Sequence, residues 1–148
     1  MGILDQIRKD RLEQGKLATD MLAGILDSIP TDGLPVPNRM GMDAAIVKSE
    51  SEKIFCFSQI AFGWDNETAE NVLTAIVDRA ASLGSVSVID PVALIPPDTN
   101  TETIKQVILG IANSSERHGI IVGKGHTEIT SKVKVITLVV SALGSVKI

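Results

Sequence analysis

The sequence predicts an α+β fold, a two-layer α/β sandwich in which two long helices cover one face of a sheet of about five mostly antiparallel strands. Two segments, near residues 66–83 and 101–118, carry apolar residues at helical spacing. Short apolar runs typical of strands come before, between and after them, and the Gly and Pro residues that favour turns separate these segments. Since 148 residues is the length of one domain, the order of segments indicates a single core between a helix layer and a sheet.

The first part of the chain is polar and helical in pattern. Residues 2–14 hold apolar residues among charges, which indicates a short or frayed helix. A second helix is predicted from Leu17 to about Ser28. Prolines and glycines then mark a loop to about Gly41. We therefore divide the chain into an N-terminal helical segment and loop, 1–40, and an α/β domain, 41–148.

The α/β domain begins with two predicted strands, Ala44–Lys48 and Lys53–Ala61, joined by a polar turn. The helix over residues 66–83 follows, with Asp65 or Asn66 as its cap. Next comes a strand from Ser85 to Ile95, in which Asp90-Pro91 predicts a bulge or an edge defect because proline cannot donate a ladder hydrogen bond.

The second long helix opens on a capping-box pattern, Thr99 to Glu102, and ends at Gly119 after Arg117 and His118. Two more strands are predicted, Ile120–Val122 and Val133–Leu143. The last of them carries apolar residues on both faces, which is typical of a strand that is buried on both sides. A second subunit could provide that cover.

The amino-acid composition of the chain excludes some classes of function. The chain is 44% hydrophobic but only 3% aromatic, so its core must be aliphatic. The positive mean hydropathy of +0.24 fits either apolar surface that a partner covers or a well-filled aliphatic core. The net charge of −4 and the lack of a basic stripe argue against nucleic-acid binding.

The sequence also indicates the cellular compartment and the chemistry that its cysteine can take part in. The charged N-terminus does not resemble a signal peptide, and no apolar run is long enough to cross a bilayer. We expect a cytoplasmic protein without a membrane partner. The single Cys56 excludes an internal disulfide and a multi-cysteine metal site.

The densest polar constellation is the segment Gly123-Lys124-Gly125-His126-Thr127-Glu128. It is not a P-loop, because its glycine spacing is one residue short, Gly125 stands at the Ser/Thr position, and a strand rather than a helix is predicted to follow. Its His-x-Glu lacks the paired cysteines of a zinc deaminase. A Mg²⁺ site built from carboxylates such as Glu128, Asp43 and Asp78 stays open, beside the reading that these are solvated side chains.

Four segments, in this order, carry a resemblance to a known family. Gly41–Val47 is similar to a Gly-Asp-Asp-Ala-Ala-Val strand, and Ala75–Gly84 to a helix that ends in Ala-Ala-Met-Gly-Ala. Leu94–Pro97 is similar to a strand end, and Gly125–Glu128 to Gly-Gly-His-Thr-Glu. Over about residues 15–144 the chain resembles the N-terminal domain of the aminoimidazole ribonucleotide (AIR) synthase superfamily (PurM, HypE, ThiL and SelD), and most closely the archaeal AIR synthase-related, HypE-like proteins.

This resemblance implies a domain that forms a homodimer through its sheet. It also implies an ATP and Mg²⁺ site that is held by acidic residues and glycines and completed by a C-terminal domain. Candidate nucleotide- or phosphate-binding residues carried over from it are Asp43, Asp78, Arg79, Lys124, Gly125, His126, Thr127 and Glu128, of which Asp43, Asp78 and Glu128 are the metal candidates.

The sequence also departs from the family pattern. Met42 replaces the first Asp, residues 57–60 replace a Thr-Asp strand, Arg79 replaces a carboxylate, and Lys124 replaces a glycine. Added positive charge disfavours a divalent cation but attracts phosphate. We also expect the chain to lack the family's C-terminal domain.

Three hypotheses follow. The preferred one is a stand-alone dimeric module with a degenerate ATP/Mg site, which acts in binding, regulation or assembly. A separate protein of the C-terminal-domain type is a candidate partner. The isolated chain is then not expected to be an enzyme. The second is an ATP-dependent ligase or phosphotransferase of the AIR synthase, HypE or ThiL type, in which Lys124 or Arg79 stabilises phosphate charge. The third is a small-anion or nucleotide sensor that uses Lys124, Arg79 and the Gly125 backbone.

Overall fold

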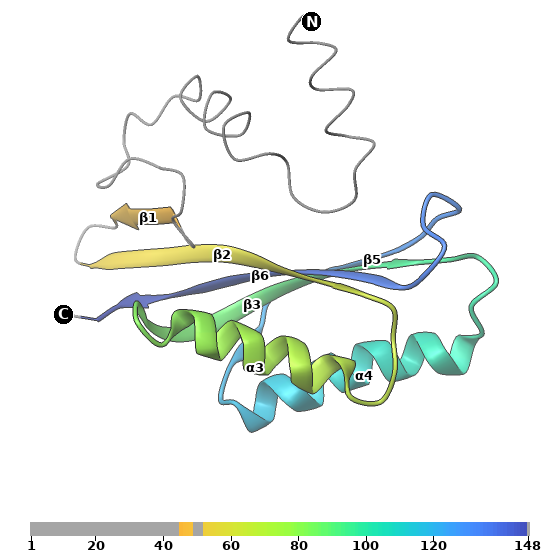
Figure 1. The fold of residues 1–148 in the computed structure, drawn as a ribbon, viewed down its shortest axis with the longest axis horizontal. Helices are drawn as coiled ribbons and strands as arrows, with labels where there is room; N and C mark the ends of the chain where they lie inside the picture. The colour runs from red at the N-terminus through yellow and green to blue at the C-terminus, as the bar shows by residue number, and fades with distance from the viewer. Residues whose placement is uncertain (1–44, 49–51, 148) are drawn as a thin grey trace, which may run out of the picture.

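The computed structural model describes residues 45–48 and 52–147, which form two layers (Figure 1). The helices predicted within residues 1–40, that segment itself, Met42 and Asp43 lie outside the described residues. The described elements, in chain order, are β1 (Ala45–Lys48), β2 (Lys53–Phe62), α3 (Thr68–Ala80), β3 (Gly84–Ile95), α4 (Thr101–Arg117), β4 (Ile121–Val122), β5 (His126–Ile129) and β6 (Thr137–Val146).

The strands form one sheet in the order β1-β2-β6-β3-β4, and β5 also pairs with β3. The three pairings among β1, β2, β6 and β3 are antiparallel, whereas β4 and β5 run parallel to β3. β6 therefore lies in the middle of the sheet, although it comes last among the described strands. The predicted α+β fold, with a mostly antiparallel sheet, is confirmed.

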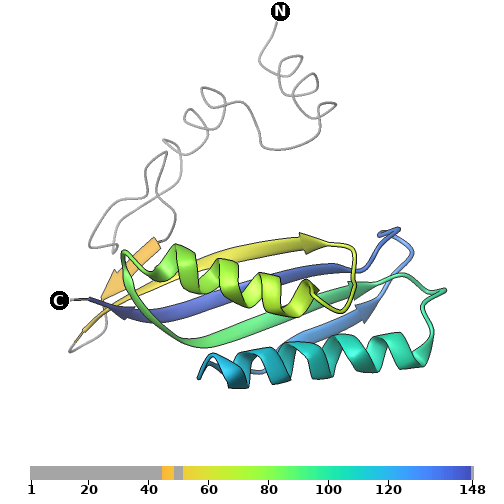
Figure 2. The ribbon, with the colours of Figure 1, turned by 60° about the horizontal axis from the view of Figure 1, so that its bottom comes forward.

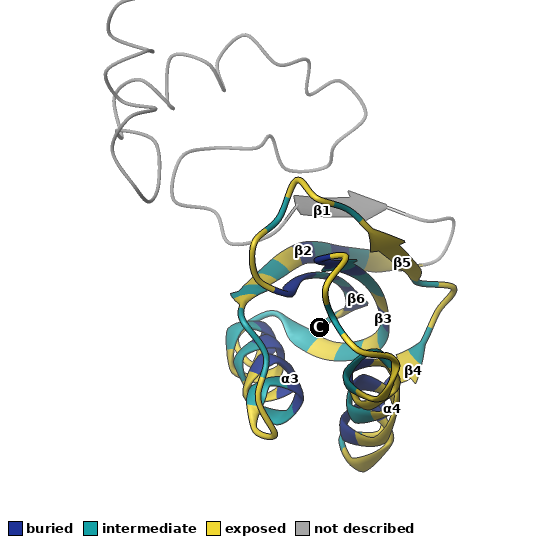
Figure 3. Ribbon diagram, turned by 90° about the vertical axis from the view of Figure 1, so that its right-hand side faces the viewer, coloured by how far each residue is buried: buried dark blue, intermediate teal, exposed yellow. Residues whose placement is uncertain are grey.

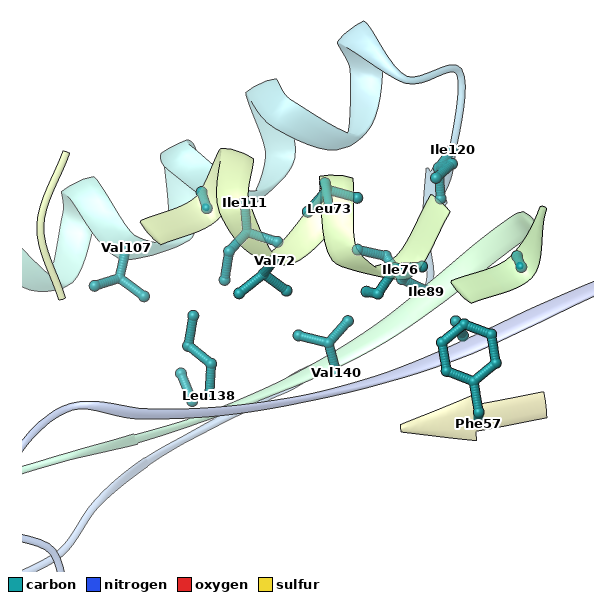
Figure 4. Close-up of a cluster of buried hydrophobic side chains, with 14 of the residues drawn as sticks. Phe57, Val72, Leu73, Ile76, Ile89, Val107, Ile111, Ile120, Leu138 and Val140 are labelled. Atoms are coloured by element: carbon teal, nitrogen blue, oxygen red, sulfur yellow. The ribbon is translucent and has the colours of Figure 1, made fainter. Parts of the chain in front are cut away.

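Both helices cover the same face of the sheet, as Figures 2 and 3 show. Their apolar residues recur every three or four positions, so each helix presents one buried stripe to the strands. The stripe of α3 contains Leu73 and Ile76, both fully buried, and that of α4 contains Val107 and Ile111. Figure 4 shows these side chains directed at Leu138 and Val140 of β6. The core is aliphatic, as composition predicted, with a stacked pair of rings, Phe55 and Phe57, at a centroid distance of 6.0 Å.

Polar residues fix where each helix begins. Asn100 caps α4, and its side chain accepts a hydrogen bond of 2.8 Å from the Thr103 backbone N–H. Before α3, the Asp65 carboxylate accepts hydrogen bonds from the Glu67 backbone N–H and from the Thr68 hydroxyl, at 2.8 and 3.1 Å. These contacts lower the pKa of Asp65, the Glu67 contact most. The observed N-cap positions differ from the predicted ones: α3 begins after Glu67, which forms no side-chain cap hydrogen bond, rather than after Asp65 or Asn66, and the cap of α4 is Asn100 rather than a Thr99–Glu102 capping box.

Three further details differ from the prediction. The irregular register in β3 falls between Val86 and Val88 rather than at Asp90-Pro91. The final strand begins at Thr137, four residues later than predicted, and runs to Val146. Residues 126–129, expected to connect two strands, form a strand of their own, β5. No helix among the described residues has the length and apolar character that crossing a membrane requires.

The face of the sheet that none of the described helices covers is named here the open face. Side chains alternate between the two faces along each strand, and the pairing register places Val139 between Ile60 and Val92, and Thr137 between Phe62 and Leu94. Ile60 is 50% exposed and Phe62 75% exposed. Other members of the open face are Ile54, Cys56, Ser58, Val88, Asp90, Ile121, His126, Glu128, Ser141, Leu143 and Ser145.

Candidate functional site

The segment Gly123–Gly125 lies at the sheet edge where β4 gives way to β5. β4 pairs with Val88 and Ile89, and β5 resumes the pairing at Val92. Pro91 lies in the gap between them and has no N–H to donate. Of the bulge or edge defect predicted at Asp90-Pro91, the edge defect is therefore present, as an interruption of the parallel ladder. Two backbone N–H groups in the segment find other acceptors: that of Gly123 donates to the Ile89 carbonyl at 2.7 Å, and that of Gly125 to Asp90 Oδ1 at 2.6 Å.

Gly125 is required at this crossing for two reasons. Its φ of +66° lies in the left-handed region that other residues rarely adopt, and an added Cβ would lie 3.1 Å from the Pro91 carbonyl oxygen. A side chain here would push the segment away from β3. The glycine therefore holds Lys124 and His126 close to the sheet edge.

The alternation of β5 sends its polar side chains to opposite faces of the sheet. His126 and Glu128 lie on the open face, where His126 Nε2 is 2.8 Å from Glu128 Oε2. Their side chains are 60% and 55% exposed. Thr127 pairs in register with Ala93, so it faces the helices. The three consecutive residues that stood out in the sequence therefore do not form one constellation.

A cavity of about 290 Å³ lies on the helix side of this edge, between α4 and β3. It exists because short residues meet there: Ala93 on the sheet, Ala112 on the helix and Gly125 at the edge. The lining is otherwise mostly aliphatic, and Lys124 and Thr127 contribute polar groups. Its residues are Pro91, Ala93, Val107, Ile108, Ile111, Ala112, Val122, Lys124, Gly125, His126 and Thr127.

Arg79 lies in a different part of the fold. Its guanidinium donates hydrogen bonds to the Ser58 carbonyl at 2.7 Å and to Gln59 Oε1 at 3.0 Å, and it lies 4.3 Å from the centre of the Phe57 ring. These partners belong to β2, and both β6 and β3 separate β2 from β5. Three strand spacings amount to about 14 Å, so the structure does not bring Arg79 and Lys124 together.

The metal candidates are equally dispersed. Asp78 is an exposed residue of α3, Glu128 lies on the open face of β5, and Asp43 is outside the described residues. Over residues 45–48 and 52–147, no group of three or more His, Cys, Asp or Glu side chains could hold a metal ion. A Mg²⁺ ion bound in the described part of the chain would therefore depend on ligand phosphates in addition to one or two carboxylates.

A second polar cluster was not identified from the sequence. Glu70 of α3 contacts Arg117 at 3.1 Å and His118 at 2.8 Å, beside a groove of about 340 Å³ between the two helices. The hydrogen bond with His118, and then that with Arg117, lowers the pKa of Glu70 from its usual 4.5. Since the partners are nearly fifty positions apart in the chain, no local pattern could have revealed the cluster.

Solved structures share this architecture at low sequence identity. ThiL in the AaThiL complex with AMPPCP and TMP superposes with a TM-score of 0.65 and 16% identity over 85% of this chain and 40% of its own. For the HypE–HypF complex the TM-score is 0.64 and the identity 15%, over 88% of this chain and 43% of the other. PurL of Thermotoga maritima in complex with ATP gives 0.64 and 15%, over 90% and 25%.

These likenesses establish the fold that the chain shares with domains of ThiL, HypE and PurL. The chain spans about two fifths of the ThiL and HypE chains and a quarter of the PurL chain. No protein-family model matches the sequence, and no curated protein matches it.

Proposed function

We propose that the described domain is a binding or assembly module that forms a homodimer through the open face of its sheet and carries a degenerate nucleotide site of the AIR synthase type. The observation that carries this proposal is the open face itself. Ile60 and Phe62 expose half and three quarters of their surfaces, and the neighbouring Val139, Val92 and Leu94 are half-buried. A contiguous apolar surface of this kind is typical of a protein interface.

The dispersed charges support the degenerate site. Asp78 belongs to α3, which covers one face of the sheet, whereas Glu128 lies on the open face, and the guanidinium of Arg79 is bound to β2. A nucleotide with its metal would need these groups to converge. At the sheet edge, Lys124 adds a positive charge that attracts anions and repels Mg²⁺.

The dimer can be tested by sedimentation velocity on the unmodified chain and on two matched variants. Ile60→Glu places a carboxylate among the exposed apolar residues of the open face, and Leu109→Glu places one on the surface of α4; the two residues are 50% and 48% exposed. An unpaired charge in an apolar interface costs several kcal/mol, so the dissociation constant of Ile60→Glu should rise by at least about a hundredfold. Leu109→Glu should still dimerise. A monomeric wild type at micromolar concentration, or equal weakening by both variants, would contradict the proposal.

The second candidate is an ATP- and Mg²⁺-dependent ligase or phosphotransferase that works with a separate partner of the C-terminal-domain type. It is favoured by the nucleotides in the ThiL and PurL complexes, and in those proteins the corresponding domain is only part of a longer chain. Thermal-shift titration with ATP, ADP and AMP separates the candidates. The degenerate site predicts no shift that depends on Mg²⁺, whereas a Mg²⁺-dependent shift of several degrees with ATP would favour the enzyme.

A further inference from the structure

We infer that the cavity between α4 and the β4–β5 edge binds a small carboxylate that carries an apolar body. This inference is independent of the proposed dimer, and it assigns Lys124, Gly125 and Thr127, which the resemblance suggested as nucleotide-binding residues, to another class of ligand. It assigns a ligand class to a site on the helix side of the sheet, whereas the proposed interface is the open face.

The interior of the cavity is apolar and already shaped. Val107 is fully buried, and Ala93 and Ile111 are 4% and 5% exposed, so one wall belongs to the packed core. Ile108, on the outer side of α4, is 49% exposed and can close over a bound apolar group. A volume of about 290 Å³ lies at the lower end of the range for small-molecule sites. It corresponds to about ten water volumes, so a short aliphatic chain or a single ring fits.

The polar groups of the cavity are available to a ligand. Lys124 and Thr127 line it, and no described residue forms a hydrogen bond or an ion pair with either side chain. The two nearest carboxylates in sequence or register have other partners: Asp90 Oδ1 accepts from Gly125, and Glu128 is paired with His126 on the open face. An ammonium and a hydroxyl at the edge of an apolar cavity match a carboxylate head on an apolar body.

Other ligand classes fit less well. Inorganic phosphate has no apolar part to fill the aliphatic interior, and a nucleoside triphosphate is much larger than the cavity. A purely apolar molecule would leave the Lys124 and Thr127 groups unused. The combination of interior and edge therefore selects amphipathic monoanions, and the small buried area limits their affinity to the high-micromolar or millimolar range.

The test uses hexanoate as the probe and records ¹H–¹⁵N correlation spectra of the intact chain during titration. Hexanamide has a similar body without the charge, and acetate has the charge without the body. We expect saturable shifts at the backbone amides of Ala93, Lys124, Gly125, Thr127 and α4 residues 108–112. Hexanamide and acetate should each bind at least about fivefold more weakly than hexanoate.

Two variants and their matched controls locate the site. Ala112→Leu fills the cavity from an exposed helix position, and Lys124→Gln removes the cation; each should weaken hexanoate at least about fivefold. Ala81→Leu and Lys105→Gln make the same exchanges at exposed positions outside the cavity and should leave binding unchanged.

Three outcomes would overturn the inference. The first is the absence of saturable shifts at the cavity residues. The second is shifts confined to the open face, around Ile60 and Phe62. The third is equal affinity for hexanoate and hexanamide, because the cation would then play no part in recognition. Sedimentation of the same samples keeps the outcome separate from the proposed dimer.

Discussion

A single added methyl group at Gly144 should disturb this fold strongly. Gly144 lies in β6 between Phe55 of β2 and Val86 of β3, with the fully buried Phe55 ring above it. An alanine Cβ would overlap the Ser85 carbonyl oxygen and come within 2.5 Å of Phe55 Cζ. The backbone conformation at Gly144 is one that any residue adopts, since it is absent from the positive-φ glycines. Steric overlap is therefore the cause of the expected destabilisation.

The expected loss of stability depends on whether the atoms that the added methyl group meets can shift. Overpacking a core by a methylene group costs about 1–3 kcal/mol when side chains can adjust. Here one obstacle is the backbone of the neighbouring strand, so we place Gly144→Ala at about 3 kcal/mol or more. For a domain whose free energy of unfolding is about 5–15 kcal/mol, this is a large fraction. The melting temperature should fall by more than about 12 °C.

Gly63→Ala is the matched control. Gly63 has a φ of +87° and nothing within 4 Å of an added Cβ, so its cost is conformational alone, about 1 kcal/mol. Urea denaturation followed by circular dichroism measures both variants. The reasoning would be refuted if Gly144→Ala were no more destabilising than Gly63→Ala.

Three further predictions concern helix ends and charged contacts. Asn100→Ala should lower the free energy of unfolding by about 1 kcal/mol in the same urea experiment, because the α4 cap is lost; an unchanged midpoint would contradict the assigned cap. Since the pKa of Glu70 is lowered in the folded state, its stabilising contribution is present above about pH 4.5 and is lost as the pH falls through the folded-state pKa. Glu70→Gln should therefore flatten the acid side of the melting temperature against pH, and an identical profile would count against the His118 contact. Arg79→Met should lower the free energy of unfolding, measured by thermal unfolding, by about 1–2 kcal/mol and leave the nucleotide titrations unchanged. Loss of nucleotide binding in a fully folded variant would instead show that Arg79 binds phosphate.

The long elements could be predicted because their own residues encode them. The helical spacing through Val72, Leu73 and Ile76 identified α3, and the run from Lys53 identified β2. β5 was missed because it contains no apolar alternation: its four residues are all exposed, and only pairing with β3 makes them a strand. A strand that depends on its neighbour leaves little trace in its own sequence.

The candidate site was predictable only in part. The glycines of residues 123–125 indicate a sharp turn, but their position beside Pro91 could not be predicted, because it depends on the pairing of β5 with β3. The cavity could not be predicted either, because it arises from short residues at Ala93, Ala112 and Gly125 that are distant in the chain. The binding of Arg79 to β2 is likewise a long-range contact, and its residue type alone does not distinguish it from an anion ligand.

The central position of β6 also has a consequence for how the chain acquires its structure. β2 and β3 do not pair with each other, and each has its longest pairing with residues 137–146. During synthesis, both strands must wait with unpaired edges until those residues leave the ribosome. Folding then closes loops of more than forty residues, a topology that is intrinsically slow and exposed to aggregation. We therefore expect truncation before Thr137 to abolish the sheet rather than shorten it.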